Sequence, residues 1–193
     1  MKGRPTLFEN AELVSKAQQI FWKKGYTATS LNDLLTATGV GSGSFYNSFK
    51  GGKKEVFSAA IQQRREAFND FRKILEGSEF PLMLIKDFFR SIAKAKQTDH
   101  FKGCIIANTV VEMTFIDDEL EADAIRILKD VEQMFVSAIE REREFGHLQN
   151  PLSSQVLGRY LITFWCGLNT LRRIYPDEKV LAAQVEMQLD ILA

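Results

Sequence analysis

The chain has 193 residues, of which 45% are hydrophobic, and its 25 basic and 25 acidic side chains give a formal net charge of zero. This length allows one large domain, or a small domain joined to a larger one, with a sizeable core. The N-terminal MKGRPTLFEN has no apolar core and no apolar run reaches membrane-span length, so we expect neither a signal peptide nor a membrane segment.

The helical periodicity of the apolar residues predicts an all-α chain of about nine helices, with no strands or repeats. The first helix is expected at about residues 11–24, ending at Gly25, and the second at 31–38. Ser30 is a good N-cap for that second helix, and Asp33 three residues later makes a capping box plausible. Gly39 supplies the left-handed residue that ends it.

A third, shorter helix is expected from Ser42 to Phe49. Phe45 and Phe49, four residues apart, should pack inward. The opposite face carries small or hydrogen-bonding uncharged groups that can approach a DNA groove closely: Ser42, Gly43, Ser44, Tyr46 and Asn47. Two short helices around a glycine turn are typical of a helix-turn-helix DNA reader. The alternative is a plain helical hairpin with a solvated second helix.

The distribution of charge agrees with a DNA reader at the N-terminal end. Residues 1–54 carry eight basic and three acidic side chains, whereas the remaining residues carry 17 basic and 22 acidic ones. A basic head on an acidic body indicates a localised site for phosphate.

Residues 21–57 resemble the TetR family of bacterial repressors. The matching pieces are Phe21, Gly25-Tyr26, Thr29-Ser30, Thr38-Gly39-Val40, Gly43-Ser44-Phe45-Tyr46, Phe49, Lys53 and Phe57. One departure is the segment Phe49-Lys50-Gly51-Gly52-Lys53, which has one residue more than many members and resembles a branch with a Phe-x-Gly-Gly-Lys segment. The resemblance implies a helix-turn-helix DNA-binding domain at residues 1–52. It also implies an effector-binding and dimerisation domain at residues 53–193.

Individual roles follow for the DNA reader. Ser44 and Asn47 are expected to bond base edges, since Asn suits adenine N6 and N7. Other residues are expected to contact phosphates and fix the register: Thr29, Ser30, Tyr46 and Lys53. The amides near Gly52 offer a further anion site. Arg4 either reaches a minor groove or belongs to a solvated tail.

The remaining predicted helices cover about residues 52–76, 80–96, 103–115, 118–145, 150–173 and 178–192. The last two are expected to form a homodimer interface as a four-helix bundle, which would pair two readers on a palindromic DNA operator. The predicted interface residues are Leu157, Leu161, Phe164, Leu168, Leu181, Val185 and Leu189. The alternative is that these side chains pack against their own chain.

A repressor also needs a small-molecule effector that favours one conformation. The predicted pocket residues are Met83, Phe89, Phe101, Cys104, Asn108, Glu112, Phe115 and Trp165. Cys104 has a second interpretation, because it follows Lys102-Gly103 at the expected start of a helix, where a thiol pKa is lowered. Its alternatives are an electrophile or oxidant sensor and an inert buried cysteine.

The sequence gives no indication of an enzyme. His100 and His147 stand in unrelated contexts, and no nucleophile motif, phosphate-binding loop or metal-ligand cluster occurs. The two cysteines, Cys104 and Cys166, form neither a disulfide framework nor a metal spacing, so we expect a cytoplasmic protein without cofactor. A helical adaptor without a DNA role is the competing class.

Overall fold

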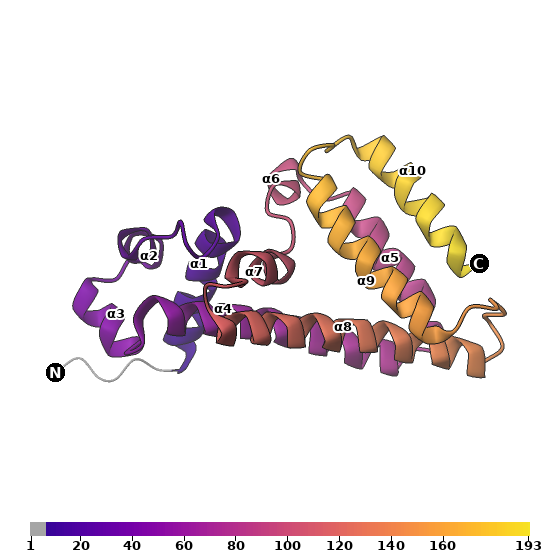
Figure 1. The fold of residues 1–193 in the computed structure, drawn as a ribbon, viewed down its shortest axis with the longest axis horizontal. Coiled ribbons are helices and arrows are strands. Elements are labelled where there is room, and N and C mark those ends of the chain that lie inside the picture. The colour runs from indigo at the N-terminus through magenta and orange to yellow at the C-terminus, as the bar shows by residue number, and fades with distance from the viewer. Residues whose placement is uncertain (1–6) are drawn as a thin grey trace. The chain divides into compact units, whose positions relative to one another are not determined.

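The computed structural model describes residues 7–193, and this part of the chain is all helical (Figure 1). The α-helices are α1 (Leu7–Lys24), α2 (Leu31–Thr38), α3 (Ser42–Ser48), α4 (Gly52–Glu76), α5 (Pro81–Ala93), α6 (Gln97–His100), α7 (Ile105–Met113), α8 (Asp118–Glu144), α9 (Ser154–Leu171) and α10 (Glu178–Leu189). A 3₁₀ turn, η1 (Asp190–Leu192), follows α10.

All nine expected helices are present, and the all-α prediction is confirmed. The sequence pattern did not predict α6, a four-residue helix. It is too short to show a hydrophobic period, and it occupies the connection between the predicted fifth and sixth helices. The bounds expected for α2 agree with the structure, whereas α9 begins later than expected, because its N-cap is Ser153 and not a residue near Asn150.

The chain packs as two compact units. Unit 1 contains residues 7–67 together with Ile105–Ala124, and unit 2 contains Phe68–Cys104 and Ile125–Ala193. The expected domain boundary after residue 52 lies inside unit 1, which continues into α4 and also includes α7 and the start of α8. An element distant in sequence therefore packs with the helix-turn-helix region.

Unit 1 is built around buried aromatic rings. Phe21 and Phe57 meet edge to face with centroids 4.8 Å apart, and Tyr26 lies 4.9 Å from Phe57. Phe45 and Phe49 lie 5.4 Å apart and are 0% and 4% exposed. Phe45 and Phe49 anchor α3, whose seven residues are too few for a helix that is stable alone.

Unit 2 has its own aromatic core. Phe89 stacks on Phe164 at 4.9 Å and lies next to Phe88, whose ring also faces Trp165. In unit 2, α10 packs against α5 (Figure 1). Arg90 of α5 forms an ion pair with Glu186 of α10.

Most of the residues predicted at a dimer interface belong to this core. Leu157, Leu161, Leu168, Leu181, Val185 and Leu189 are at most 3% exposed within the single chain. Phe164 is half-buried against Phe89. Packing against the rest of the same chain, the alternative interpretation, therefore accounts for the spacing of these side chains. The exposed apolar side chains on α9 and α10 are different ones: Val156, Leu171, Val180 and Met187.

None of the helices described between residues 7 and 193 is both long enough and apolar enough to cross a membrane.

Candidate nucleic-acid interface

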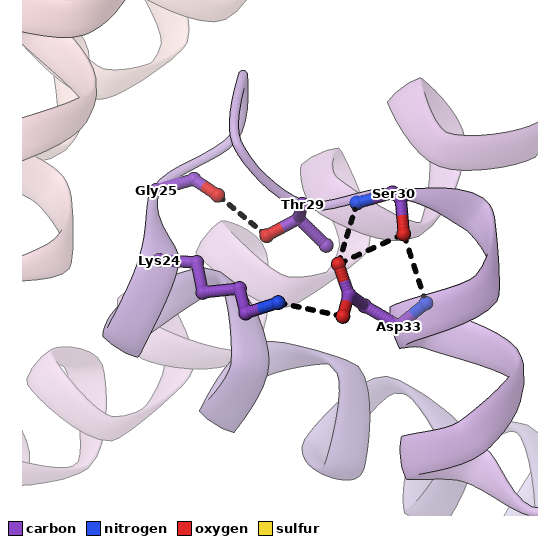
Figure 2. Close-up of polar contacts among 5 residues, drawn as sticks. All are labelled: Lys24, Gly25, Thr29, Ser30 and Asp33. Atoms are coloured by element: carbon purple, nitrogen blue, oxygen red, sulfur yellow. Dashed lines mark hydrogen bonds and ion pairs between the residues drawn. The ribbon is translucent and has the colours of Figure 1, made fainter.

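The turn between α1 and α2 is stabilised by backbone and side-chain hydrogen bonds (Figure 2). Gly25 ends α1 with a φ of +83°, which a glycine adopts readily. Thr29 donates its hydroxyl to the Gly25 carbonyl at 2.6 Å. Ser30 then caps α2: its hydroxyl oxygen accepts from the Asp33 amide at 3.1 Å, and the Asp33 carboxylate accepts from the Ser30 amide at 2.9 Å. The predicted capping box is confirmed.

Besides Ser30, Asp33 also contacts a residue of α1. The Lys24 ammonium lies 2.6 Å from its carboxylate (Figure 2). The hydrogen bond from Lys24, followed by those from Ser30, lowers the pKa of Asp33 from 3.8 to about 2. The carboxylate therefore stays ionised at neutral pH and keeps the start of α2 joined to the end of α1.

The helix α3 presents an uncharged, exposed face. Its N-cap is Gly41 and its one buried helical residue is Phe45, as the spacing predicted. The predicted reading residues are exposed: Ser42, Gly43, Ser44, Tyr46 and Asn47. Gly39 ends α2 with a φ of +73°, so the left-handed position expected at the helix turn is also confirmed.

The segment between α3 and α4 differs from the expectation in one contact. The Gly51 amide donates to the Glu55 carboxylate at 2.6 Å. A side chain of α4 therefore accepts from one of the amides that were expected to bind an anion. Tyr46 lies next to this segment, since a Cβ added at Gly52 would come within 3.4 Å of its ring.

Lys53 is placed over the α1–α2 turn. Its ammonium lies 4.3 Å from the centre of the Tyr26 ring and 3.4 Å from the Thr27 carbonyl, to which it donates. Burial lowers the pKa of Lys53, and the nearby charge of Glu112 opposes that effect. The side chain predicted to bind phosphate thus starts from a position fixed by the turn.

Two of the predicted phosphate-binding residues have structural partners. Thr29 is 1% exposed and its hydroxyl is bonded to Gly25, while Ser30 is engaged in the capping box. Both residues shape the entry to α2. Arg4 lies outside the described residues.

Unit 1 contains a set of charged contacts that the sequence analysis missed. Glu112 of α7 accepts hydrogen bonds from the backbone amides of Tyr26 at 2.9 Å and Thr27 at 2.7 Å. Lys54 pairs with Asp117 at 2.9 Å and with Glu119 at 2.8 Å, and these acids raise its pKa. A separation of more than 60 residues hides such pairs from local spacing rules.

The predicted effector-pocket residues are spread over both units. Phe89 and Trp165 are buried in the aromatic core of unit 2, whereas Met83 and Phe101 are more than half exposed there. Asn108, Glu112 and Phe115 belong to unit 1, where Phe115 is 97% exposed and Glu112 is bound to the α1–α2 turn. A groove of about 250 Å³ in unit 2 lies elsewhere, and its lining residues include Arg72, Asp130, Met134 and Arg141.

Cys104 lies directly before α7 and is 5% exposed. It is within electrostatic reach of a second thiol and a guanidinium. Burial, with a smaller contribution from Cys104, raises the pKa of Cys166 to about 11. Burial lowers the pKa of Arg172, and Cys104 opposes that shift. Within the described part of the chain, buried Arg172 Nε and His100 Nδ1 have no hydrogen-bond partner.

Two family descriptions match this chain. "Bacterial regulatory proteins, tetR family" covers residues 13–60, which include α2 and α3. "Tetracyclin repressor-like, C-terminal domain" covers residues 82–187, which is more than half of the chain.

Similar proteins include known transcriptional regulators. The chain is 29% identical over 160 residues to the HTH-type transcriptional repressor DhaR of Mycobacterium sp. (strain GP1), covering 80% of this chain and 77% of DhaR. It is 28% identical over 195 residues to the uncharacterized HTH-type transcriptional regulator YezE of Bacillus subtilis (strain 168), covering 98% and 99%. A cysteine mutant of the TetR family transcriptional regulator CifR, complexed with 26-bp double-strand operator DNA, has the same fold. The TM-score is 0.80 at 22% identity, covering 99% of this chain and all of that one.

Proposed function

Because the chain belongs to the TetR family of bacterial regulatory proteins, and is therefore a DNA-binding transcriptional regulator, we propose that it is a cytoplasmic repressor released from a palindromic operator by a small molecule. The observation that carries the proposal is α3, which presents Ser44, Tyr46 and Asn47 on an exposed uncharged face while Phe45 fixes the helix from below. No catalytic role and no cofactor are proposed.

The proposed contacts divide into readers and positioners. Ser44 and Asn47 contact base edges in the major groove, with Ser42 and Gly43 allowing close approach. Tyr46 and Lys53 contact phosphates and set the register. Arg4 completes the contacts from the minor groove. The extra residue before Lys53 supports membership of a branch with a Phe-x-Gly-Gly-Lys segment.

The palindrome requires a homodimer, because one seven-residue reading helix gives little affinity and two readers about 34 Å apart match one DNA turn. The proposed dimer surface lies on α9 and α10. Since the residues first predicted there are buried in the protomer, the exposed side chains Val156, Leu171, Val180 and Met187 are the better candidates. Such exposed apolar side chains on adjacent helices suit a four-helix contact.

The effector site is proposed in unit 2. Phe89 and Trp165 belong to an aromatic cluster there, and apolar, aromatic linings are usual for small-molecule pockets.

The proposal is tested by selecting bound sequences from a random duplex library. We expect enrichment of a palindrome by the wild-type protein, and weaker enrichment with relaxed preference at one position in each half-site for Asn47→Ala. Exposed Glu140 on α8 provides a control, because Glu140→Gln changes a residue outside both α3 and the proposed dimer surface and should keep the palindrome. If no duplex is enriched, and the retention of DNA by the protein does not depend on salt concentration, the result would instead indicate a helical adaptor.

A second candidate function is thiol sensing through Cys104. The observation that favours it is the electrostatic interaction of Cys104 with the Arg172 guanidinium and the Cys166 thiol. An electrophile with an activated carbon–carbon double bond, such as a maleimide, would add at this site: the Cys104 sulfur bonds to one carbon of the double bond and the thiol proton passes to the other. Burial to 5% exposure favours the inert alternative.

The two alternatives are separated by treating the DNA complex with N-ethylmaleimide. Under the sensing hypothesis the wild type and Cys166→Ser release the operator, whereas Cys104→Ser does not. Equal release by wild type and Cys104→Ser would assign Cys104 to the inert core.

A further inference from the structure

The α1–α2 turn has two neighbouring amide donors that no group within the turn accepts. Gly25 and Thr29 donate to Phe21 and Tyr26 backbone carbonyls, at 2.7 and 3.1 Å. The amides of Tyr26 and Thr27 instead reach the two carboxylate oxygens of Glu112, one oxygen each. A carboxylate that accepts from two successive amides fixes the backbone of both residues.

The turn is shaped to admit this carboxylate. A Cβ added at Gly25 would lie 3.0 Å from both Glu112 oxygens, tighter than nine in ten real Cβ contacts, so the carboxylate would have to shift. The positive φ of Gly25 adds a second reason for glycine at this position. The bonding of Glu112 to the turn thus depends on both partners.

A cation faces the same two residues. Lys53 lies over the Tyr26 ring and donates to the Thr27 carbonyl, and its charge interacts with that of Glu112. Tyr26 and Thr27 are therefore held by Glu112 through their amides and by Lys53 through a ring and a carbonyl. The turn leads directly into Ser30, the N-cap of α2.

Glu112, which bonds to the α1–α2 turn, lies on a segment that joins the two units along the chain. Glu112 belongs to Ile105–Ala124, which packs in unit 1, but the chain on both sides of this segment belongs to unit 2. The segment has a second attachment inside unit 1, through the ion pairs of Lys54 with Asp117 and Glu119. A displacement of this segment would be transmitted to the turn through these contacts.

We propose that Glu112 is a positioning residue for DNA binding, whose carboxylate holds the α1–α2 turn and Lys53 in the DNA-competent arrangement. This inference rests on the proposed DNA-binding function and assigns Glu112 to the reader rather than to an effector pocket. Removal of the carboxylate takes the acceptor from both amides, loosens the turn, and increases the ordering that DNA binding must supply.

The test is Glu112→Gln, which keeps the size of the side chain but replaces one acceptor oxygen with an amide donor. We expect operator affinity to fall roughly ten-fold, as expected when a hydrogen bond to a charged group is lost. In the free protein, amide hydrogen exchange at Tyr26 and Thr27 should accelerate, while Leu34 in α2 stays protected. The probe is the duplex enriched by the wild-type protein.

Glu121→Gln is the matched control. Glu121 lies on the same segment of unit 1 and accepts from the Thr114 hydroxyl at 2.9 Å. It should leave both the exchange at Tyr26 and Thr27 and the operator affinity within two-fold of the wild type.

Three results would overturn the inference. Unchanged exchange in Glu112→Gln would show that the carboxylate does not hold the turn. Faster exchange with wild-type affinity would show that the turn is held but does not position the reader. Equal losses in Glu121→Gln would assign the effect to the segment as a whole. Failure of the DNA-binding function is distinguishable, because the wild type itself would then enrich no duplex.

Discussion

Replacing Phe45 with alanine tests whether the placement of α3 depends on one buried ring. Phe45 is 0% exposed and is the one buried residue among the seven of α3. Truncating a fully buried phenylalanine costs about 3–5 kcal/mol, from lost transfer energy and the cavity left behind. That is a large part of the 5–15 kcal/mol that stabilises a typical domain. Phe45→Leu retains most of the apolar volume and should cost about 1–2 kcal/mol.

The two tryptophans of the chain make this measurement local. Trp22 lies in α1 of unit 1, and Trp165 lies in unit 2. In a Trp165→Phe background, urea unfolding followed by Trp22 fluorescence reports unit 1. With an m-value of about 2 kcal/mol/M, a loss of about 4 kcal/mol lowers the Trp22 midpoint by roughly 2 M for Phe45→Ala. For Phe45→Leu the same m-value gives a fall of about 0.5–1 M.

Operator affinity should follow the same order, with Phe45→Ala weakest, since a displaced α3 cannot present Asn47. A Trp22 midpoint within about 0.3 M of the parent protein, with unchanged operator binding, would refute the idea that Phe45 anchors the reader.

Three further predictions concern charge, pH and close packing. Tyr46→Ala and Lys53→Ala should weaken binding to all sequences, and Lys53→Ala should also reduce the slope of log K against log salt by about 0.9; an unchanged slope removes Lys53 from the phosphate contacts. The folded-state pKa of Asp33 is lowered from 3.8 to about 2, so its contribution to stability is fully present above about pH 4 and disappears as pH falls through about 2. Asp33→Asn should therefore flatten the change in urea midpoint between pH 2 and 4, and an equally steep change would contradict this. Gly158→Ala would place a Cβ against Val136 Cγ2 and 3.3 Å from the Val136 backbone nitrogen. The overpacking cost of about 1–3 kcal/mol should exceed the gain of about 1 kcal/mol in helix propensity, so the midpoint reported by Trp165 falls, whereas a rise would show that α8 and α9 separate easily.

The local structure of the reader follows from residues that are close in sequence. Ser30 and Asp33 lie within one helix turn of each other, and Gly39 bonds to Leu35 one turn before it, so these hydrogen bonds and backbone conformations follow from local spacing. Phe45 and Phe49 share a helix face for the same reason, and both are buried as expected. The family resemblance, carried by these same residues, agrees with the matched family.

Contacts between residues that are far apart in the sequence become visible only in the folded protein. The spacing of Leu157, Leu161 and Leu168 suited a dimer surface, yet a leucine stripe has the same period whether it packs on a partner or on its own chain. Glu112 illustrates the same limit. The sequence predicts Glu112 in an effector pocket, whereas its actual partners, the amides of Tyr26 and Thr27, lie more than 80 residues earlier. Every residue except proline has a backbone amide, so the sequence cannot indicate which amides a side chain will bind. The bond between Glu112 of α7 and the α1–α2 turn is therefore visible only in the folded protein.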